Sequence, residues 1–352
     1  MGGRAEAEPE MIDRRTLLAL AAGSVAGIRP GLAQSTALRI GYVPVIGASA
    51  LFVLAGDGSA RDAGLELKLT KFDSGPNAIQ AFASGTIDIL VIGVAPVAVA
   101  RSRGLDTSVI TAAAVGGTAF VAGPALAKAF AENADDPAKA FAAFRAATGR
   151  KAKLGTLPPG GVPTVALHHW LWTIGKVERS DVEIVNMGIE VVQQAMLTGA
   201  IDGGTLLEPS ATLVSERDPR IKRIVNSPDM FPNIPGVVVA ASGALVKNRP
   251  EVAERFVGLF HQATERIRKE PAKVAPFVLA VLGGDLVAES TIAKALVSPA
   301  VSFVNDPAQI RKATEALLAY QVELGDFPQA PALDGLFNQA LYERGVRSSP
   351  SR

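Results

Sequence analysis

The sequence predicts an α/β protein with two similar lobes that are joined by two crossover segments. Between residues 37 and 225, short apolar segments alternate with segments of helical periodicity. Such alternation is typical of a mainly parallel sheet flanked by helices. One phrase also occurs twice, since residues 81–88 read AFASGTID and residues 195–202 read AMLTGAID. The length of 352 residues is enough for about two domains.

Gly and Pro residues divide the first series of elements. Ser74 suits the N-cap of a helix and Pro76 its first turn. The wholly apolar segment 87–93 is typical of a strand buried in a parallel sheet. The expected elements are strand 37–44, helix 47–64, strand 65–72, helix 74–85, strand 87–93, helix 96–104 and strand 107–115.

A second series repeats this order at a constant spacing. Gly41 and Gly155 are 114 residues apart, and Asp88 and Asp202 are separated by the same 114 residues. Generic βαβ units would explain the periodicity but not the common spacing, so we predict two matched lobes. The expected elements are strand 150–158, helix 162–175, strand 181–188, helix 190–199, strand 201–209 and strand 220–225.

Two extended apolar segments, 118–123 and 236–242, follow the two series and are expected to cross between the lobes. Residues 244–345 have mostly helical periodicity and begin no third series. We therefore assign these helices to the first lobe. The predicted domains are 34–119 together with 237–352 for lobe 1, and 120–236 for lobe 2. Two crossings predict a hinge with a cleft between the lobes.

The N-terminal residues 1–33 are predicted to be a secretory signal peptide. A pair of arginines precedes an apolar run, residues 16–28, and a Pro-Gly-Leu-Ala ending follows. The run of about 13 residues is too short for a permanent transmembrane helix. The arginines fit a twin-arginine signal as well as an ordinary Sec signal, and both Met1 and Met11 fit as the start. We expect a periplasmic protein without stable membrane insertion.

Composition and motifs exclude several classes of function. A net charge of +1 lacks the basic excess typical of nucleic-acid binding. The absence of cysteine excludes disulfides, thiolate metal sites and a cysteine nucleophile. His168 and His169 are adjacent, so on a helix they point about 100° apart and cannot share a metal ion. We predict no catalytic residue, no metal site and no cofactor.

The predicted cleft lies beyond the carboxyl ends of the strands, where open α/β sheets bind their ligands. These loops are rich in Gly, Pro, Ser and Thr, and they expose backbone N–H groups at helix N-termini that favour anionic or strongly polar groups. Glu208 lies at such an end, where a ligand contact and a structural role both fit. Asp88 and Asp202 lie at the opposite ends of their strands, so we expect them to stabilise the turn.

The segments FDSGPNAIQAFASGTIDILVIGVAPVAVARSRG and AMLTGAIDGGTLLEP resemble the nitrate/sulfonate/taurine-type substrate-binding proteins of ABC importers. That family also includes binders of bicarbonate and of thiamine-pyrimidine precursors. The resemblance covers roughly residues 37–270. It implies a monomeric, non-enzymatic protein with a type II periplasmic binding protein fold. Such a protein would capture a small molecule and deliver it to a permease with a cytoplasmic ATPase.

The resemblance also implies a set of binding residues. By position, and with Gly188 added from loop 186–188, the expected ligand-binding residues are Tyr42, Val43, Pro44, Ser74, Gly75, Val94, Ala95, Gly160, Gly161, Thr164, Gly188 and Glu208. These loops carry no Arg, Lys or His, which many oxyanion binders of the family have, although Lys71 lies near one loop.

Several alternatives stay open. A pyrimidine-precursor or aromatic ligand, neutral or cationic and facing Glu208, fits beside nitrate and sulfonate. A ligand-sensing accessory protein is a second possibility. An enzyme on the same fold, such as a pyrimidine-precursor synthase or deaminase, would need a reactive cluster in the cleft.

Overall fold

The computed structural model describes residues 1–3, 35–134, 136–283 and 287–348. The predicted signal peptide lies outside the described residues except for its first three. The chain separates into two units, Met1–Ser35 and Thr36–Arg352, and all that follows concerns the second unit. Within the described part of the chain, no helix is long and apolar enough to cross a membrane.

The first sheet has six strands in the order β11-β4-β10-β3-β1-β2. Strands β1, β2 and β3 are parallel, whereas β10 is antiparallel to both β3 and β4, and β11 is antiparallel to β4. Four of the six strands therefore share one direction. The strands are β1 (Thr36–Tyr42), β2 (Leu65–Lys71), β3 (Ile89–Gly93), β4 (Thr107–Gly116), β10 (Pro235–Ser242) and β11 (Val301–Phe303).

The second sheet has five strands in the order β7-β6-β8-β5-β9. Strands β6, β7 and β8 are parallel, and β5 is antiparallel to both β8 and β9. The strands are β5 (Thr118–Ala122), β6 (Ala152–Thr156), β7 (Val182–Asn186), β8 (Gly203–Leu207) and β9 (Lys222–Asn226).

The two sheets are matched and exchange one strand each. Strand β5 follows β4 of the first sheet but pairs in the second, and β10 follows β9 of the second sheet but pairs in the first. In each sheet the exchanged strand is the antiparallel one between the third and fourth strands of the repeat. The predicted two-lobed α/β class is confirmed, and the two apolar segments expected as crossovers are these exchanged strands.

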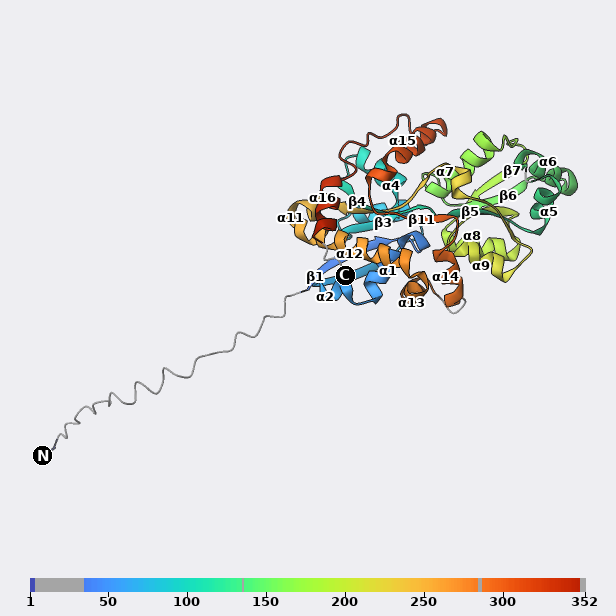
Figure 1. Ribbon diagram of the computed structural model, residues 1–352. Coiled ribbons are helices and arrows are strands. Elements are labelled where there is room, and N and C mark those ends of the chain that lie inside the picture. Colours follow the sequence, from blue (N-terminus) through green and yellow to red (C-terminus); the bar gives the residue numbers. More distant parts are fainter. Residues whose placement is uncertain (4–34, 135, 284–286, 349–352) are drawn as a thin grey trace. The chain divides into compact units, whose positions relative to one another are not determined.

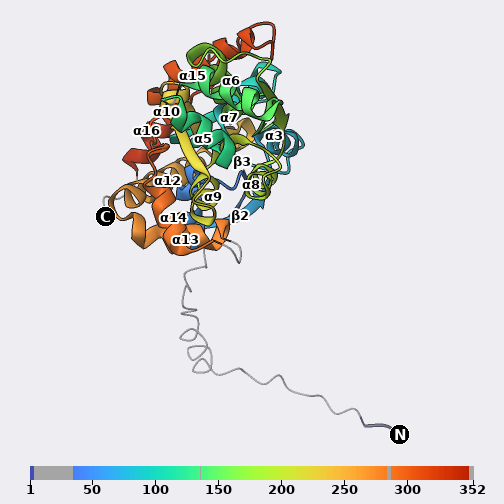
Figure 2. The same ribbon diagram turned by 90° about the vertical axis from the view of Figure 1, so that its right-hand side faces the viewer.

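Helices cover both faces of each sheet. In Figure 1, α4 and α15 lie above the first sheet, and α1 and α12 lie below it. Figure 2 shows α3 of the first lobe and α8 of the second on one side of this unit, with α10 and α16 on the other. The helices of the first half are α1 (Ser49–Gly56), α2 (Ser59–Asp62), α3 (Gly75–Ala83), α4 (Val94–Ser102), α5 (Pro124–Glu132), α6 (Pro137–Thr148) and α7 (Val162–His168). Those of the second half are α8 (Ile189–Thr198), α9 (Ser210–Arg217), α10 (Ser227–Met230), α11 (Gly243–Asn248), α12 (Pro250–Lys269), α13 (Pro271–Leu282), α14 (Glu289–Leu296), α15 (Ala308–Glu323) and α16 (Gln339–Arg347).

Three predicted elements differ from the structure. The helix expected at 47–64 is divided into a 3-10 turn, Ile46–Ala48, and the helices α1 and α2, because Gly58 adopts a φ of 86° between them. The helix expected at 162–175 changes from α7 to a π-helical segment at His169–Ile174. The largely helical C-terminal region also contributes β11, which extends the edge of the first sheet.

An aromatic cluster holds α5, α6 and the π-helical segment on the second sheet. Phe120 of β5 lies with its ring centroid 4.7 Å from that of Trp170, and Phe130 and Phe141 pack on both. All four side chains are buried. Aromatic side chains bury a large apolar area, so this cluster fixes the helices that carry the second lobe's loops.

Candidate functional site: the boundary between the two sheets

The carboxyl ends of β2, β3, β6 and β7 lead into α3, α4, α7 and α8, whose N-termini face the boundary between the sheets. A cavity of about 50 Å³ lies there, and both lobes line it. Val43, Gly75 and Pro96 contribute from the first lobe, and Leu157 and Val162 from the second. A Cβ placed on Gly93 would lie 3.3 Å from Val162 Cγ2, so the lobes are in contact.

Three of the predicted binding residues, Val43, Gly75 and Gly161, line this cavity. Gly160 lines an adjoining groove instead. The structure therefore brings together loops from both lobes that are more than 80 residues apart in sequence.

Other predicted binding residues support the walls. Ser74 accepts a hydrogen bond from Asn77 N (3.4 Å) and so caps α3. Thr164 donates to Leu157 O (2.6 Å), which fixes the loop before α7. The ring of Tyr42 packs edge-on against Phe52, with centroids 5.3 Å apart.

The remaining first-lobe positions are close by but are not in the cavity wall. Pro44 follows Val43 directly, and Val94 and Ala95 are the fully buried first residues of α4. Gly188 precedes α8, and a Cβ there would lie 3.8 Å from the Cβ of Asp73 on the other lobe. Gly188 therefore lies where the two lobes face each other.

The cavity wall carries no charged side chain among the described residues. Prolines also reduce the number of donors, because Pro76, Pro96 and Pro163 stand within the first three positions of α3, α4 and α7. Proline has no backbone N–H. The helix N-termini therefore offer fewer donors to an anion than the loop composition alone predicts.

One ion pair connects the lobes beside the cavity. Lys71 Nζ, at the end of β2, lies 2.8 Å from Glu190 Oε1 in the first turn of α8. Its hydrogen bond to Glu190 raises the pKa of Lys71. Burial raises the pKa of Tyr42, against an opposing effect of the Lys71 charge. Lys71 is thus paired with a carboxylate of the opposite lobe.

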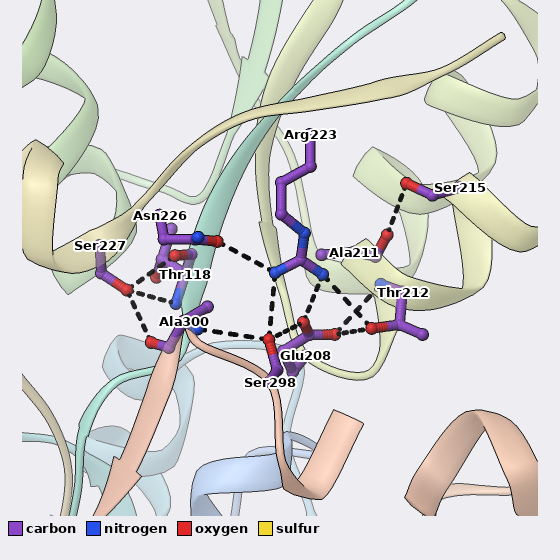
Figure 3. A network of polar contacts seen from close by, with 10 residues as sticks. All are labelled: Thr118, Glu208, Ala211, Thr212, Ser215, Arg223, Asn226, Ser227, Ser298 and Ala300. Carbon is purple, nitrogen blue, oxygen red and sulfur yellow. Dashed lines mark hydrogen bonds and ion pairs between the residues drawn. The ribbon is translucent and has the colours of Figure 1, made fainter. Parts of the chain in front are cut away.

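Glu208 is the centre of a buried polar network (Figure 3). Its Oε1 accepts hydrogen bonds from Arg223 Nη2 (2.5 Å) and Ser298 Oγ (2.6 Å), and its Oε2 accepts from Thr212 N (3.1 Å) and Thr212 Oγ1 (2.8 Å). The Glu208 side chain is 0% exposed. Four donors of the chain itself therefore satisfy the carboxylate, and Glu208 is not part of the cavity wall.

The same network joins the second lobe to the C-terminal region. Ser298 directly precedes the segment that leads into β11. Ser227 Oγ donates to Ala300 O (3.0 Å) and accepts a hydrogen bond from Thr118 N (3.0 Å) (Figure 3). The backbone O of Glu208 also accepts from Ile46 N (2.8 Å) of the first lobe. Sequence reasoning missed Arg223, Ser298 and Ser227, because nothing in their local pattern distinguishes them from solvated polar residues.

Asp88 and Asp202 have the same backbone contacts, as their common spacing predicts. Asp88 accepts from Arg39 N (3.0 Å), and Asp202 accepts from Lys153 N (2.8 Å) at the equivalent position of the second lobe. Burial raises the pKa of Asp88, but the hydrogen bonds and the charge of Arg39 outweigh it and hold that pKa below its usual value. Both carboxylates lie at the strand ends away from the cavity, as expected for a structural role.

The histidines form no common site. His169 Nδ1 lies 2.8 Å from Met230 O, and His261 Nδ1 lies 3.2 Å from Asn305 Oδ1. Burial lowers the pKa of His168, although Asp326 opposes the change. Among the described residues, no group of three or more His, Asp or Glu side chains could hold a metal ion.

A model of the NMT1-like family matches residues 31–279. No curated protein matches the chain significantly. Among solved structures, the periplasmic nitrate-binding protein NrtA from Synechocystis PCC 6803 is 14% identical, with a TM-score of 0.74 over 91% of this chain and 93% of that chain. The ligand-binding component of an ABC-type import system from Staphylococcus aureus, with zinc bound, is 16% identical. Its TM-score is 0.72, and the match covers 89% of this chain and 100% of that chain. The periplasmic aliphatic sulphonate binding protein SsuA from Escherichia coli is 17% identical. Its TM-score is 0.64, and the match covers 87% of this chain and 99% of that chain.

Proposed function

Because this chain belongs to the NMT1-like family, we propose that it is the extracytoplasmic solute-binding component of an ABC import system. One observation carries the proposal: two matched sheets exchange a strand each and so direct the N-termini of α3, α4, α7 and α8 towards one boundary. Ligand-binding sites of open α/β sheets occupy this position. A small molecule held there would contact both lobes.

The mechanism is capture followed by closure. A ligand that contacts both lobes stabilises the conformation in which they meet, and it shifts the population towards that conformation. The Lys71–Glu190 ion pair favours the same conformation, since it joins the lobes beside the cavity. No bond of the ligand is broken. The closed protein would then deliver the ligand to a permease with a cytoplasmic ATPase.

The remaining predictions belong to the same proposal. Residues 1–33 would direct export to the periplasm by a Sec or twin-arginine signal, and the mature protein would act as a monomer. Lobe 1 would comprise 34–119 and 237–352, and lobe 2 would comprise 120–236. The binding residues would be the predicted set, with Glu208 acting through the network around it and not by contact with the ligand.

A thermal-shift panel tests this proposal. Purified mature protein is heated with nitrate, taurine, alkanesulfonates, bicarbonate, pyrimidines and aromatic acids and amides. We expect one class to raise the Tm in proportion to the logarithm of its concentration. Gly188→Trp, which places a large side chain opposite Asp73, should abolish this shift, and Ala147→Trp on exposed α6 should not. A panel without any stabilising member, or turnover of a candidate substrate, would contradict the proposal.

A further inference from the structure

A large groove adjoins the small cavity between the lobes. Its volume is about 670 Å³, and its walls are one face of α3 and one face of α4. Each helix contributes positions at i, i+3, i+4 and i+7, which lie on the same side of a helix. These positions are Pro76, Ile79, Gln80 and Ala83 on α3, and Pro96, Val99 and Ala100 on α4 with Arg103 at its C-cap.

The groove is continuous with the boundary between the lobes. Pro96 lines both the groove and the small cavity. Gly160 of the second lobe lines the groove, and its neighbour Gly161 lines the cavity. The cavity of about 50 Å³ has room for little more than one water molecule, whereas small-molecule sites usually have about 300–1,000 Å³. Of the two, the groove has the volume for an organic ligand in this conformation.

The wall of the groove is mostly apolar, and its charges cancel. Phe327 and Leu105 extend the apolar surface of the two helices. Arg103 and Asp326 are the charged residues of the wall, one cation and one anion. A wall with no net charge and no buried cation does not favour an anion over a neutral molecule.

One polar group in the wall requires a donor. Gln321 of α15 is fully buried, and its Nε2 donates to Asp326 Oδ2 (3.0 Å). Its Oε1 has no hydrogen-bond partner within the part of the chain that the structure describes. Buried acceptors are normally paired, because an unpaired one has lost its bonds to water. A ligand with an N–H or O–H group can supply the missing bond once the Gln321 side chain, which lines the groove, turns its Oε1 towards it.

We propose that the groove between α3 and α4 is a ligand subsite for a neutral organic molecule with an apolar body and an N–H or O–H donor. The apolar body packs between the two helices, and the donor binds Gln321 Oε1. This inference rests on the proposed function and specifies its ligand class. A small inorganic oxyanion would leave the groove empty and the Gln321 acceptor unpaired.

Matched probes and two groove variants test the inference by calorimetry on the mature protein. The probes are aromatic and alicyclic primary amides and alcohols, led by 2-phenylacetamide, each paired with its carboxylate, and nitrate and taurine are included. We expect a neutral probe to bind more tightly than its carboxylate. Ala83→Trp fills the groove from an exposed position and should weaken this binding at least tenfold, whereas the control Ala147→Trp should leave it unchanged.

The second variant, Gln321→Met, keeps the side-chain volume but removes the acceptor. It should weaken amides and alcohols about tenfold and leave a probe without a donor, such as an ether of the same shape, unaffected. If only anions bind, and Ala83→Trp does not affect them, the groove inference fails while the proposed function stands. If neither anions nor neutral probes bind, both fail. If neutral probes bind but Ala83→Trp does not change their affinity, the inference is also overturned.

Discussion

Removal of the Arg223 side chain should be among the most damaging single changes at the junction of the lobes. Arg223→Met keeps the apolar stem but leaves the Glu208 carboxylate buried without its cation. Glu208 is 0% exposed and Arg223 is 23% exposed, so water can compensate only at the edge of the pair. Arg223 Nη1 also donates to Asn226 Oδ1 (3.0 Å), and that bond would be lost too.

The expected cost follows from the partners that remain. Breaking a buried ion pair by removing one partner costs about 3–5 kcal/mol. Thr212 and Ser298 would still donate to Glu208, so we expect the lower end, about 3 kcal/mol. Glu208→Gln should cost less, about 1–2 kcal/mol, because the partly exposed Arg223 can turn towards water. The double variant Glu208→Gln/Arg223→Met should be more stable than the sum of the single effects predicts, by about 1–2 kcal/mol.

Thermal unfolding of the mature protein measures these effects. For a chain of this size, about 2 °C of Tm corresponds to 1 kcal/mol, so Arg223→Met should lower the Tm by about 6 °C. The control is Arg220→Met, because Arg220 pairs with Asp218 at an exposed position shortly before β9. It should leave the Tm unchanged. An Arg223→Met protein as stable as the Arg220→Met protein, or additive effects in the double variant, would refute the argument that the buried pair is a unit.

Three further predictions concern other contacts. Asp88→Asn should destabilise the protein at pH 7. Its deficit should shrink as the pH falls below the usual carboxyl pKa and through the lowered pKa of the folded Asp88, because the stabilisation by Asp88 is complete only above the usual carboxyl pKa. Urea midpoints of both proteins between pH 7 and pH 3 measure this, and a deficit independent of pH would contradict it. Lys71→Glu should weaken binding of any ligand found by the thermal-shift panel by about two- to fivefold, and Lys71→Glu/Glu190→Lys should restore it, since the pair is exposed and joins the lobes. Unrestored affinity in the swapped protein would argue against the ion pair. Gly204→Ala should destabilise by about 1–3 kcal/mol, because its Cβ would lie 2.4 Å from Gly155 O where β8 pairs with β6. Gly199→Ala has no atom within 4 Å of its Cβ and is strained only by its φ of 71°, so it should lose less. Equal losses for the two variants in urea would contradict a steric cause.

The repeat could be predicted from sequence because it rests on local chemistry that is used twice. A Gly turn, a buried strand and an Asp that accepts a backbone N–H must occur at one spacing if both lobes use the same turn. The contacts of Asp88 with Arg39 N and of Asp202 with Lys153 N have this spacing. The supporting arginines do not, since Arg39 belongs to the strand and Arg150 precedes it. Backbone geometry was therefore predictable where side-chain partners were not.

The candidate site was less predictable, because its properties depend on residues far apart in the sequence. Glu208 lies at the strand end that faces the cleft, and its position alone fits a ligand contact. Its partner Arg223 is 15 residues away and Ser298 is 90 residues away, so only the folded chain shows that the carboxylate is already satisfied. The groove also depends on residues far apart in the sequence, since Gln321 of the C-terminal region lines it together with α3 and α4.

The junction between the lobes explains why glycine stands near the start of both exchanged strands, with Gly117 directly before β5 and Gly236 as the second residue of β10. A Cβ on Gly236 would lie 2.4 Å from Gly116 O, so the two crossovers pass each other where neither has a side chain. Gly116 and Gly117 have φ values of 73° and 95°, which other residues rarely adopt. The Ser298–Ala300 segment lies against the same crossovers through Ser227 and Glu208. We therefore expect any opening of the lobes to pivot around these three segments, and we expect the network around Glu208, more than the cavity wall, to limit how far the C-terminal region follows the second lobe.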